Sequence, residues 1–289
     1  MFACAVAYAE LLNLEGHEAI PVIEGSFTSS ATPSLVALNS DYKTSYSPDG
    51  SEHFVLVDVS DPEHFAKCVN HERIMEVYDH RAGHEEYWQK KLGKDAHIEM
   101  VGACGTLIWE EFKKRGKGAQ ITKNSAKLLI GSIVSNTLAF NSPQTTERDR
   151  TAYAELKTIA GIPDDWIAQY FHEQERELLG DFKGYVKADT KVFSSAWGEF
   201  AIGQIEMWDA TEILNTHKAE IDAVMSEYNS MPWIVNILNI SKGFNYVYSK
   251  SSEGRRIIEE KIGIKFDGDT ATTPKLLMRK YLMKMLRAE

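Results

Sequence analysis

The chain of 289 residues has little of several features that mark whole classes of protein. Its 3 cysteines, Cys4, Cys68 and Cys104, lack the C-x-x-C spacing of a zinc site, so we expect buried thiols in a reducing cytoplasm. Prolines number only 8 and low-complexity runs are missing, which is typical of a folded globular protein. The longest apolar runs, such as residues 128–134, fall far short of the ~20 residues of a membrane-spanning helix. The opening residues show no signal-peptide pattern, so the sequence predicts a cytoplasmic protein without a membrane partner.

An excess of positive charge is also missing, since the formal net charge is -10. Proteins that hold a long nucleic acid present clustered Lys and Arg to the phosphate backbone, so this composition argues against such a partner. A small phosphorylated ligand needs only a local basic pocket and is not excluded.

The length is about twice that of a usual domain, which favours two domains, although one large domain is an alternative. In the first half, strands predicted at residues 18–25, 53–61 and 74–80 are followed by helices at 101–115, 125–138, 147–160 and 164–179. Such alternation favours an α/β domain with a mostly parallel sheet. We expect this domain to span residues 1–178.

The second half has a different texture. The sequence predicts a hairpin around Gly198, a long helix at 210–228, strands at 233–240 and 244–248, and a C-terminal helix or strand from Lys275. This pattern favours a smaller α+β domain at 182–289. We interpret the stretch GDFKGY, residues 180–185, as the linker before it.

Three candidate metal-site residues stand at the ends of two predicted parallel strands. Asp58 ends FVLVD, and Asp79 and His80 end IMEVYDH. In a parallel sheet these ends emerge at one edge, where open α/β sheets bind ligands. A carboxylate beside an imidazole can hold a metal ion there. The alternative is structural: Asp58 caps a turn and Asp79 pairs with Arg81.

The same motifs resemble a known family. The run VYDHRAGHEEYW, preceded 22 residues before its histidine by the aspartate of VLVD, looks like the signature of the DHH phosphoesterases. VGACGTLIWEEF, LLIGSIVSNTLAFNSPQTTERD, DTKVF, GQIE and LMRKYLMKML resemble further motifs of the manganese-dependent, family II inorganic pyrophosphatases, in the right order over nearly the whole chain. The resemblance implies a DHH domain, a DHH-associated substrate-binding domain and an active site in the cleft between them. It also implies a homodimer.

Roles for individual residues follow from the resemblance. Asp58 would bridge two manganese ions, with magnesium or cobalt as alternatives, and His80 would bind one of them. Asp79 would orient His80. The basic residues Lys191, Arg279 and Lys280 of the second domain would bind the phosphate oxygens; without the resemblance they would be interpreted as solvated surface residues.

The chain departs from the family pattern at several positions. Arg81 replaces the second histidine of DHH, so it keeps a positive charge and phosphate-binding donors but loses the imidazole. Asn136 replaces an aspartate and would be a weaker metal ligand. His84 stands close enough in sequence to compensate.

The third departure is at the start. The family begins with a strand that carries a histidine and an Asp-x-Asp pair, whereas this chain opens on an uncapped helix at Phe2. Either an upstream segment supplies that strand, which we favour, or one metal site has been lost.

Two functions therefore follow as hypotheses. One is a metal-dependent phosphohydrolase, with pyrophosphate as the leading substrate and short polyphosphate or small nucleotides as alternatives. The other is a phosphate- or nucleotide-binding regulatory protein on the same scaffold. Arg81 and Asn136 favour the second hypothesis, and the ordered set of motifs favours the first.

Overall fold

The chain divides into two compact units, Met1–Ile167 and Ala168–Glu289. The computed structural model describes residues 1–25, 27 and 30–287, so the last two residues of the second predicted domain lie outside the described part. The division falls before the boundary expected at 178–182, because helix α7 (Trp166–Gly180) buries Leu178 in the core of the second unit. The linker predicted at 180–185 is wrong: this stretch lies mostly in helix α8 (Phe182–Ala188), whose Phe182 and Val186 are buried.

The first unit contains a three-stranded sheet in the order β1-β2-β3, formed by Phe54–Val57, Ile74–Asp79 and Ala96–Ile98. Both pairings are parallel, which confirms the parallel sheet predicted from the alternation of strands and helices. The strand predicted at 18–25 is wrong, since only an isolated bridge joins Val22 to Lys43. Pro21 lacks an N–H to donate to a ladder at that point.

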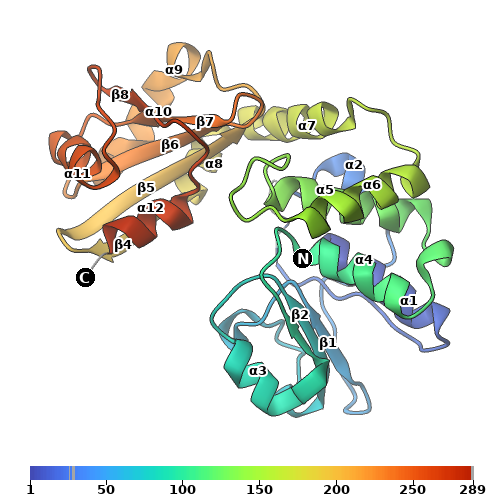
Figure 1. Cartoon of the computed structure of the whole chain (residues 1–289). Helices are drawn as coiled ribbons and strands as arrows, with labels where there is room; N and C mark the ends of the chain where they lie inside the picture. Colours follow the sequence, from blue (N-terminus) through green and yellow to red (C-terminus); the bar gives the residue numbers. More distant parts are fainter. Residues whose placement is uncertain (26, 28–29, 288–289) are drawn as a thin grey trace. The chain divides into compact units, whose positions relative to one another are not determined.

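Helices cover both faces of this sheet (Figure 1). Side chains alternate between the faces, so Val77 packs with Trp88 of α3 while Tyr78 contacts Tyr8 of α1, with ring centroids 5.0 Å apart. The helices are α1 (Phe2–Leu14), α2 (Pro33–Val36), α3 (Glu85–Leu92), α4 (Cys104–Lys114), α5 (Lys123–Asn136) and α6 (Glu147–Ala160). Those predicted at 101–115, 125–138 and 147–160 are confirmed. The three cysteines are free and buried, as expected.

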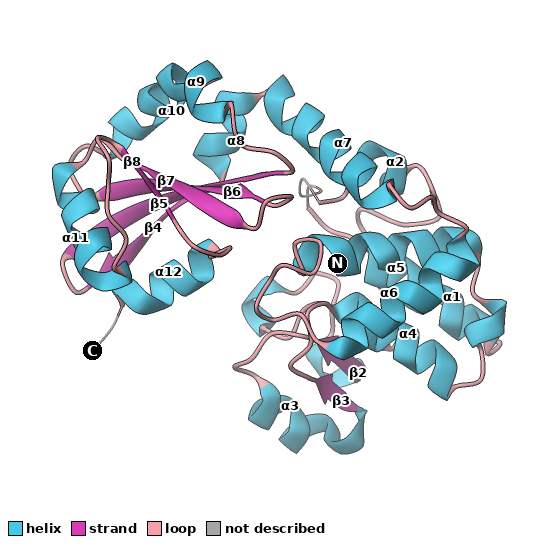
Figure 2. Ribbon diagram, turned by 45° about the horizontal axis from the view of Figure 1, so that its top comes forward, coloured by secondary structure: helices cyan, strands magenta, loops and turns pink. Residues whose placement is uncertain are grey.

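The second unit contains a five-stranded sheet in the order β4-β5-β6-β7-β8 (Figure 2). Its strands are Thr190–Ser195, Gly198–Met207, Trp233–Asn239, Phe244–Tyr248 and Thr270–Thr272. Only β5 and β6 are parallel to one another, and the other neighbouring pairs are antiparallel. The hairpin predicted around Gly198 is confirmed, and this glycine has a positive φ of 92° that favours it in the tight turn.

Two helical layers sandwich this sheet. One face packs against α8, α9 (Ile213–Thr216) and α10 (Lys218–Met225), and the other packs against α11 (Ser252–Ile262) and α12 (Arg279–Leu286). The single helix predicted at 210–228 is wrong, because it breaks at His217. The Thr216 hydroxyl donates to the carbonyl of Glu212 and lies 2.7 Å from His217 Nδ1, and such side-chain bonds compete with helix continuation. Short 3₁₀ turns occur at Pro62–His64, His71–Arg73, Gly93–Asp95, Gly118–Gln120 and Ser226–Tyr228.

One buried carboxylate, Asp149 of α6, holds the start of α4. It accepts bonds from the backbone N–H groups of Gly102 (2.9 Å) and Ala103 (3.3 Å), from the Thr106 hydroxyl (2.6 Å) and from both the N–H and the hydroxyl of Thr146 (2.7 Å each). This residue is fully buried, so every one of these donors depends on it.

We expect Asp149→Ala to lower the free energy of unfolding by about 3 kcal/mol, because several buried donors lose their acceptor. Urea denaturation followed by circular dichroism measures this. The control is Asp164→Ala, whose carboxylate is 99% exposed and pairs only with Lys157, for a change below about 1 kcal/mol. Equal losses in the two variants would contradict the role assigned to Asp149.

Candidate metal centre

The parallel pairing of β1 and β2 brings Asp58 next to Asp79 and His80. Val57 is in register with Tyr78, and the N–H of Asp58 donates to the carbonyl of Tyr78 at 2.8 Å. The chain then turns sharply, with Asp58 at a φ of 61°. This left-handed conformation is disfavoured for residues other than glycine, although aspartate tolerates it better than most, and it often marks a functional site.

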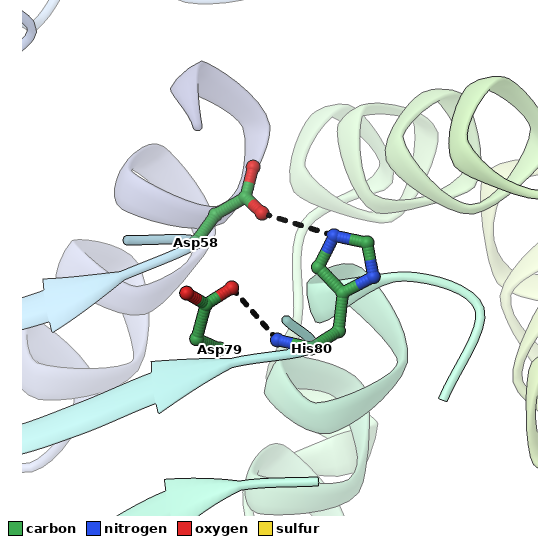
Figure 3. Close-up of side chains that lie close together, drawn as sticks. All are labelled: Asp58, Asp79 and His80. Carbon is green, nitrogen blue, oxygen red and sulfur yellow. Dashed lines mark hydrogen bonds and ion pairs between the residues drawn. The ribbon is translucent and has the colours of Figure 1, made fainter. Parts of the chain in front are cut away.

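Asp58, Asp79 and His80 place one ligand atom each within 4.8 Å of the others, a spacing that one metal ion can span. Figure 3 shows the Asp58 carboxylate pointing at the imidazole of His80, with Oδ1 3.5 Å from Nε2. All three residues are buried, with exposed fractions of 5%, 1% and 6%. The two strand ends therefore meet at one edge, as the sequence predicted.

Both carboxylate oxygens of Asp79 accept hydrogen bonds. Its Oδ2 accepts a bond from the Ser60 hydroxyl at 2.6 Å, and its Oδ1 accepts from the backbone N–H of His80 at 2.8 Å and from Arg81 Nη1 at 3.1 Å. The carboxylate thus fixes the backbone of His80. Trp88 extends this support, since its indole N–H donates to the carbonyl of Ser60 at 2.7 Å.

Arg81 lies between the two aspartates. Its Nη1 is 2.7 Å from the carbonyl oxygen of Asp58 and 3.1 Å from a carboxylate oxygen of both Asp58 and Asp79. The structural alternative drawn from the sequence, a pairing of Asp79 with Arg81, is therefore also present. The side chain is 54% exposed, and the hydrogen bonds described for it all use Nη1.

Positive charges stabilise the buried Asp58 carboxylate. Burial acts to raise the pKa of Asp58, but nearby positive charges, among them Arg81 and His80, outweigh this and the pKa is lowered. The site therefore attracts cations.

The donor set fits a divalent cation. Among the described residues, Oδ1 of Asp58 is buried and accepts no hydrogen bond of good geometry, although nitrogens of Arg81 and His80 lie 3.1 Å and 3.5 Å from it. A carboxylate together with an imidazole is a set that manganese accepts. The group found in the described part of the chain contains three residues, enough for one ion when water completes the coordination.

The two weaker candidates are not joined to this group. Asn136, at the end of α5, donates from its side-chain amide to the carbonyl of Ser132 at 3.0 Å, and none of its described contacts reaches Asp58 or His80. His84 faces Asp61, with Nε2 3.9 Å from the carboxylate, and lies outside the candidate group.

The basic residues predicted for substrate binding lie in the second unit. Arg279 donates from Nη2 to the Asp189 carboxylate at 2.8 Å and from Nη1 to its carbonyl. Lys191 is exposed, with Nζ 3.2 Å from the carbonyl of Ala188, and Lys280 is exposed beside the ring of Tyr281. The cleft expected between the domains stays a prediction.

Sequence reasoning missed Ser60 and Trp88. Ser60 stands two residues after Asp58, but a serine in a loop carries no pattern that predicts a bond to Asp79. The signal available was Asp79 itself, since a buried carboxylate requires donors.

The two α/β units and the carboxylate–imidazole group at a parallel sheet edge define a class, namely a protein with a candidate metal site of the hydrolase type. None of the described helices is long and apolar enough to cross a membrane. No established family profile matches the chain.

Individual proteins are more informative. A protein of Bacillus cereus (strain G9842) is 26% identical over 283 residues, and one of Bacillus anthracis is 26% identical over 288 residues; each match covers 96% of this chain and 90% of the relative. Both are named as manganese-dependent inorganic pyrophosphatases. The resemblance predicted from the motifs is confirmed: over nearly its whole length the chain is similar to proteins named as manganese-dependent inorganic pyrophosphatases.

Solved structures agree in fold. A Methanococcus jannaschii protein assigned to family II of the inorganic pyrophosphatases matches with a TM-score of 0.69 at 19% identity, over 99% of this chain and 95% of that one. An exopolyphosphatase-related protein of Bacteroides fragilis matches with a TM-score of 0.50 at 11% identity, over 98% and 86%. The α/β fold class predicted from the sequence is confirmed.

We expect Asp58→Asn to weaken Mn²⁺ binding at least about 100-fold, because the substitution removes one of the two carboxylates of the candidate group. Isothermal titration calorimetry with MnCl₂ measures this. Asp61→Asn is the matched control, since it removes the same charge three residues away from a side chain outside the group. If both variants bind Mn²⁺ like the unmodified chain, Asp58 is not a ligand.

Proposed function

We propose that the chain is a metal-dependent hydrolase of phosphoanhydrides, with inorganic pyrophosphate as its substrate and two phosphates as its products. The observation that carries this is the buried pairing of Asp58 with His80 at the parallel sheet edge. The similarity to proteins named as manganese-dependent pyrophosphatases supports both the reaction and the metal. Short polyphosphates and small nucleotides share the phosphoanhydride bond and are the alternative substrates.

Asp58 and His80 would hold the cation, and Asp79 would keep His80 in place through the backbone bond. A bound divalent cation supplies Lewis-acid activation of water and withdraws charge from phosphorus. All three candidate ligands are buried, which limits the access of bulk water to the cation. A second ion and a homodimer, which the resemblance implies, are part of the same proposal, and so is the cytoplasmic location expected from the composition.

Charge neutralisation would come from basic side chains. Arg81 carries donors beyond Nη1 that can reach a phosphate oxygen. Lys191, Arg279 and Lys280 of the second unit would neutralise the remaining phosphate charge, which develops further in the transition state.

We expect the chain to release phosphate from pyrophosphate in the presence of Mn²⁺, and His80→Ala to lower kcat at least about 100-fold, because a metal ligand is lost. A colorimetric phosphate assay measures both. His84→Ala is the control, since this imidazole lies outside the ligand group and should leave kcat within about twofold. Unchanged turnover in His80→Ala would remove His80 from the mechanism.

The position of Arg81 favours a second candidate function. A guanidinium 3.1 Å from both aspartates carries the kind of charge that a second cation would supply, so it competes with such a cation. A scaffold with this residue could bind phosphorylated ligands without turning them over. The protein would then be a regulatory binding protein.

Substitution of Arg81 separates the two functions. For the enzyme, we expect Arg81→Ala to raise KM for pyrophosphate about tenfold with a smaller change in kcat, because a charge-assisted bond to phosphate is lost. Steady-state kinetics with Mn²⁺ measure this. Turnover that is undetectable in the unmodified chain and emerges in Arg81→His would instead favour the binding protein.

A further inference from the structure

A chain of buried amide side chains crosses the sheet of the second unit. Asn245 on β7 donates to Asn236 Oδ1 on β6 at 2.6 Å, and Asn236 donates to Gln204 Oε1 on β5 at 3.4 Å. Both asparagines are fully buried and Gln204 is 5% exposed. Burying amides is unfavourable unless they are hydrogen-bonded. Buried amides therefore contribute less to stability than apolar side chains would, but their directional bonds fix the positions of the groups that they contact.

This amide chain holds the segment that enters α12. The carbonyl of Leu277 accepts bonds from Asn236 (2.8 Å) and Asn245 (2.6 Å), and its N–H donates to Asn245 Oδ1 at 3.2 Å. The backbone N–H of Arg279 donates to Gln204 Oε1 at 2.5 Å. The position of Arg279, and of Lys280 after it, is therefore fixed from the middle of the sheet.

The side-chain nitrogen of Gln204 contacts the carboxyl group of Glu206. Gln204 Nε2 donates to Glu206 Oε1 at 2.7 Å, and both side chains lie on the face of β5 that carries α12, two residues apart along the strand. The charged groups that act on Glu206 are Asp189, which precedes β4, and Arg279 and Lys280 of α12. Asp189 thus contacts the Arg279 side chain directly, and Glu206 is joined to the Arg279 backbone through Gln204.

We propose that Glu206 is a specificity-determining residue that sets the anion affinity of the basic pair Arg279–Lys280: neutral Glu206 permits binding of a polyphosphate anion, and ionised Glu206 opposes it. This inference rests on the proposed function, because the anion is the phosphoanhydride substrate. The inference adds to that function a carboxylate that weakens anion binding when it is ionised.

The Glu206 side chain ionises near neutral pH. Burial and the charge of Asp189 raise the pKa of Glu206 to about 7, against the Gln204 hydrogen bond and the charges of Arg279 and Lys280, which lower it. As pH falls through 7 the side chain gains a proton and loses its negative charge. Affinity for an anion should therefore rise as pH falls from 8 to 6.

The test compares the full chain with Glu206→Gln, loaded with Mn²⁺, for binding of imidodiphosphate, a pyrophosphate analogue with a bridging nitrogen. Glutamine keeps an oxygen that can accept the Gln204 bond but cannot ionise. We expect the variant to bind about tenfold more tightly than the unmodified chain at pH 8 and about equally at pH 6, by calorimetry. The analogue's own titration is the same for both proteins, so it cancels in the ratio of the two dissociation constants.

Glu199→Gln is the matched control, because it removes a carboxylate from the same strand at an exposed position, and its ratio to the unmodified chain should not change with pH. A constant ratio for Glu206→Gln, or an equal trend in Glu199→Gln, overturns the inference and leaves the proposed function intact. Lack of imidodiphosphate binding to the unmodified chain at any pH overturns both.

Discussion

The candidate site depends on one pairing, the parallel alignment of β1 with β2. The backbone bond from Asp58 to Tyr78 sets the register, so a shift by one residue would place Asp58 beside a different residue and turn its side chain to the other face. The apolar residues on both faces of β2, such as Val77 and Tyr78, fix that register because each is buried against a different helix. The geometry of the candidate metal site is thus a consequence of how the strands bury their side chains.

Because Asp58 and Asp79 are buried together, this edge of the sheet requires hydrogen-bond donors and positive charges near them. Two carboxylates in a site of low exposure repel one another unless donors and cations compensate. Asp79 is compensated by the Ser60 hydroxyl, a backbone N–H and Arg81, and Asp58 is compensated by Arg81. A divalent cation would also neutralise these carboxylates, so Arg81 and a cation can have the same electrostatic role at this site.

Much of this was predictable from the sequence, and the limits have physical causes. The strand ends at Asp58 and His80 were predicted because apolar runs with a polar terminus are a local signal, and helix α6 was predicted with its bounds because it has a capping box at Thr146 and a left-handed Gly161 at its end. The strand expected at 18–25 was wrong because its apolar residues pair only through one bridge.

Contacts distant in sequence were beyond prediction. Nothing local indicates that Ser60 donates to Asp79, which lies 19 residues further along the chain.

The two units accommodate their buried polar side chains in different ways. The first unit gathers charged ligands at the end of a small parallel sheet, where few atoms separate them. The second unit runs neutral amides through the centre of its sheet and uses them to hold one short segment, Leu277 to Arg279. Neutral amides impose direction without adding charge, so the net charge near Arg279 is left to Asp189 and Glu206. In such an arrangement a single proton on one carboxylate changes the electrostatics of the basic pair while the backbone that carries it stays fixed.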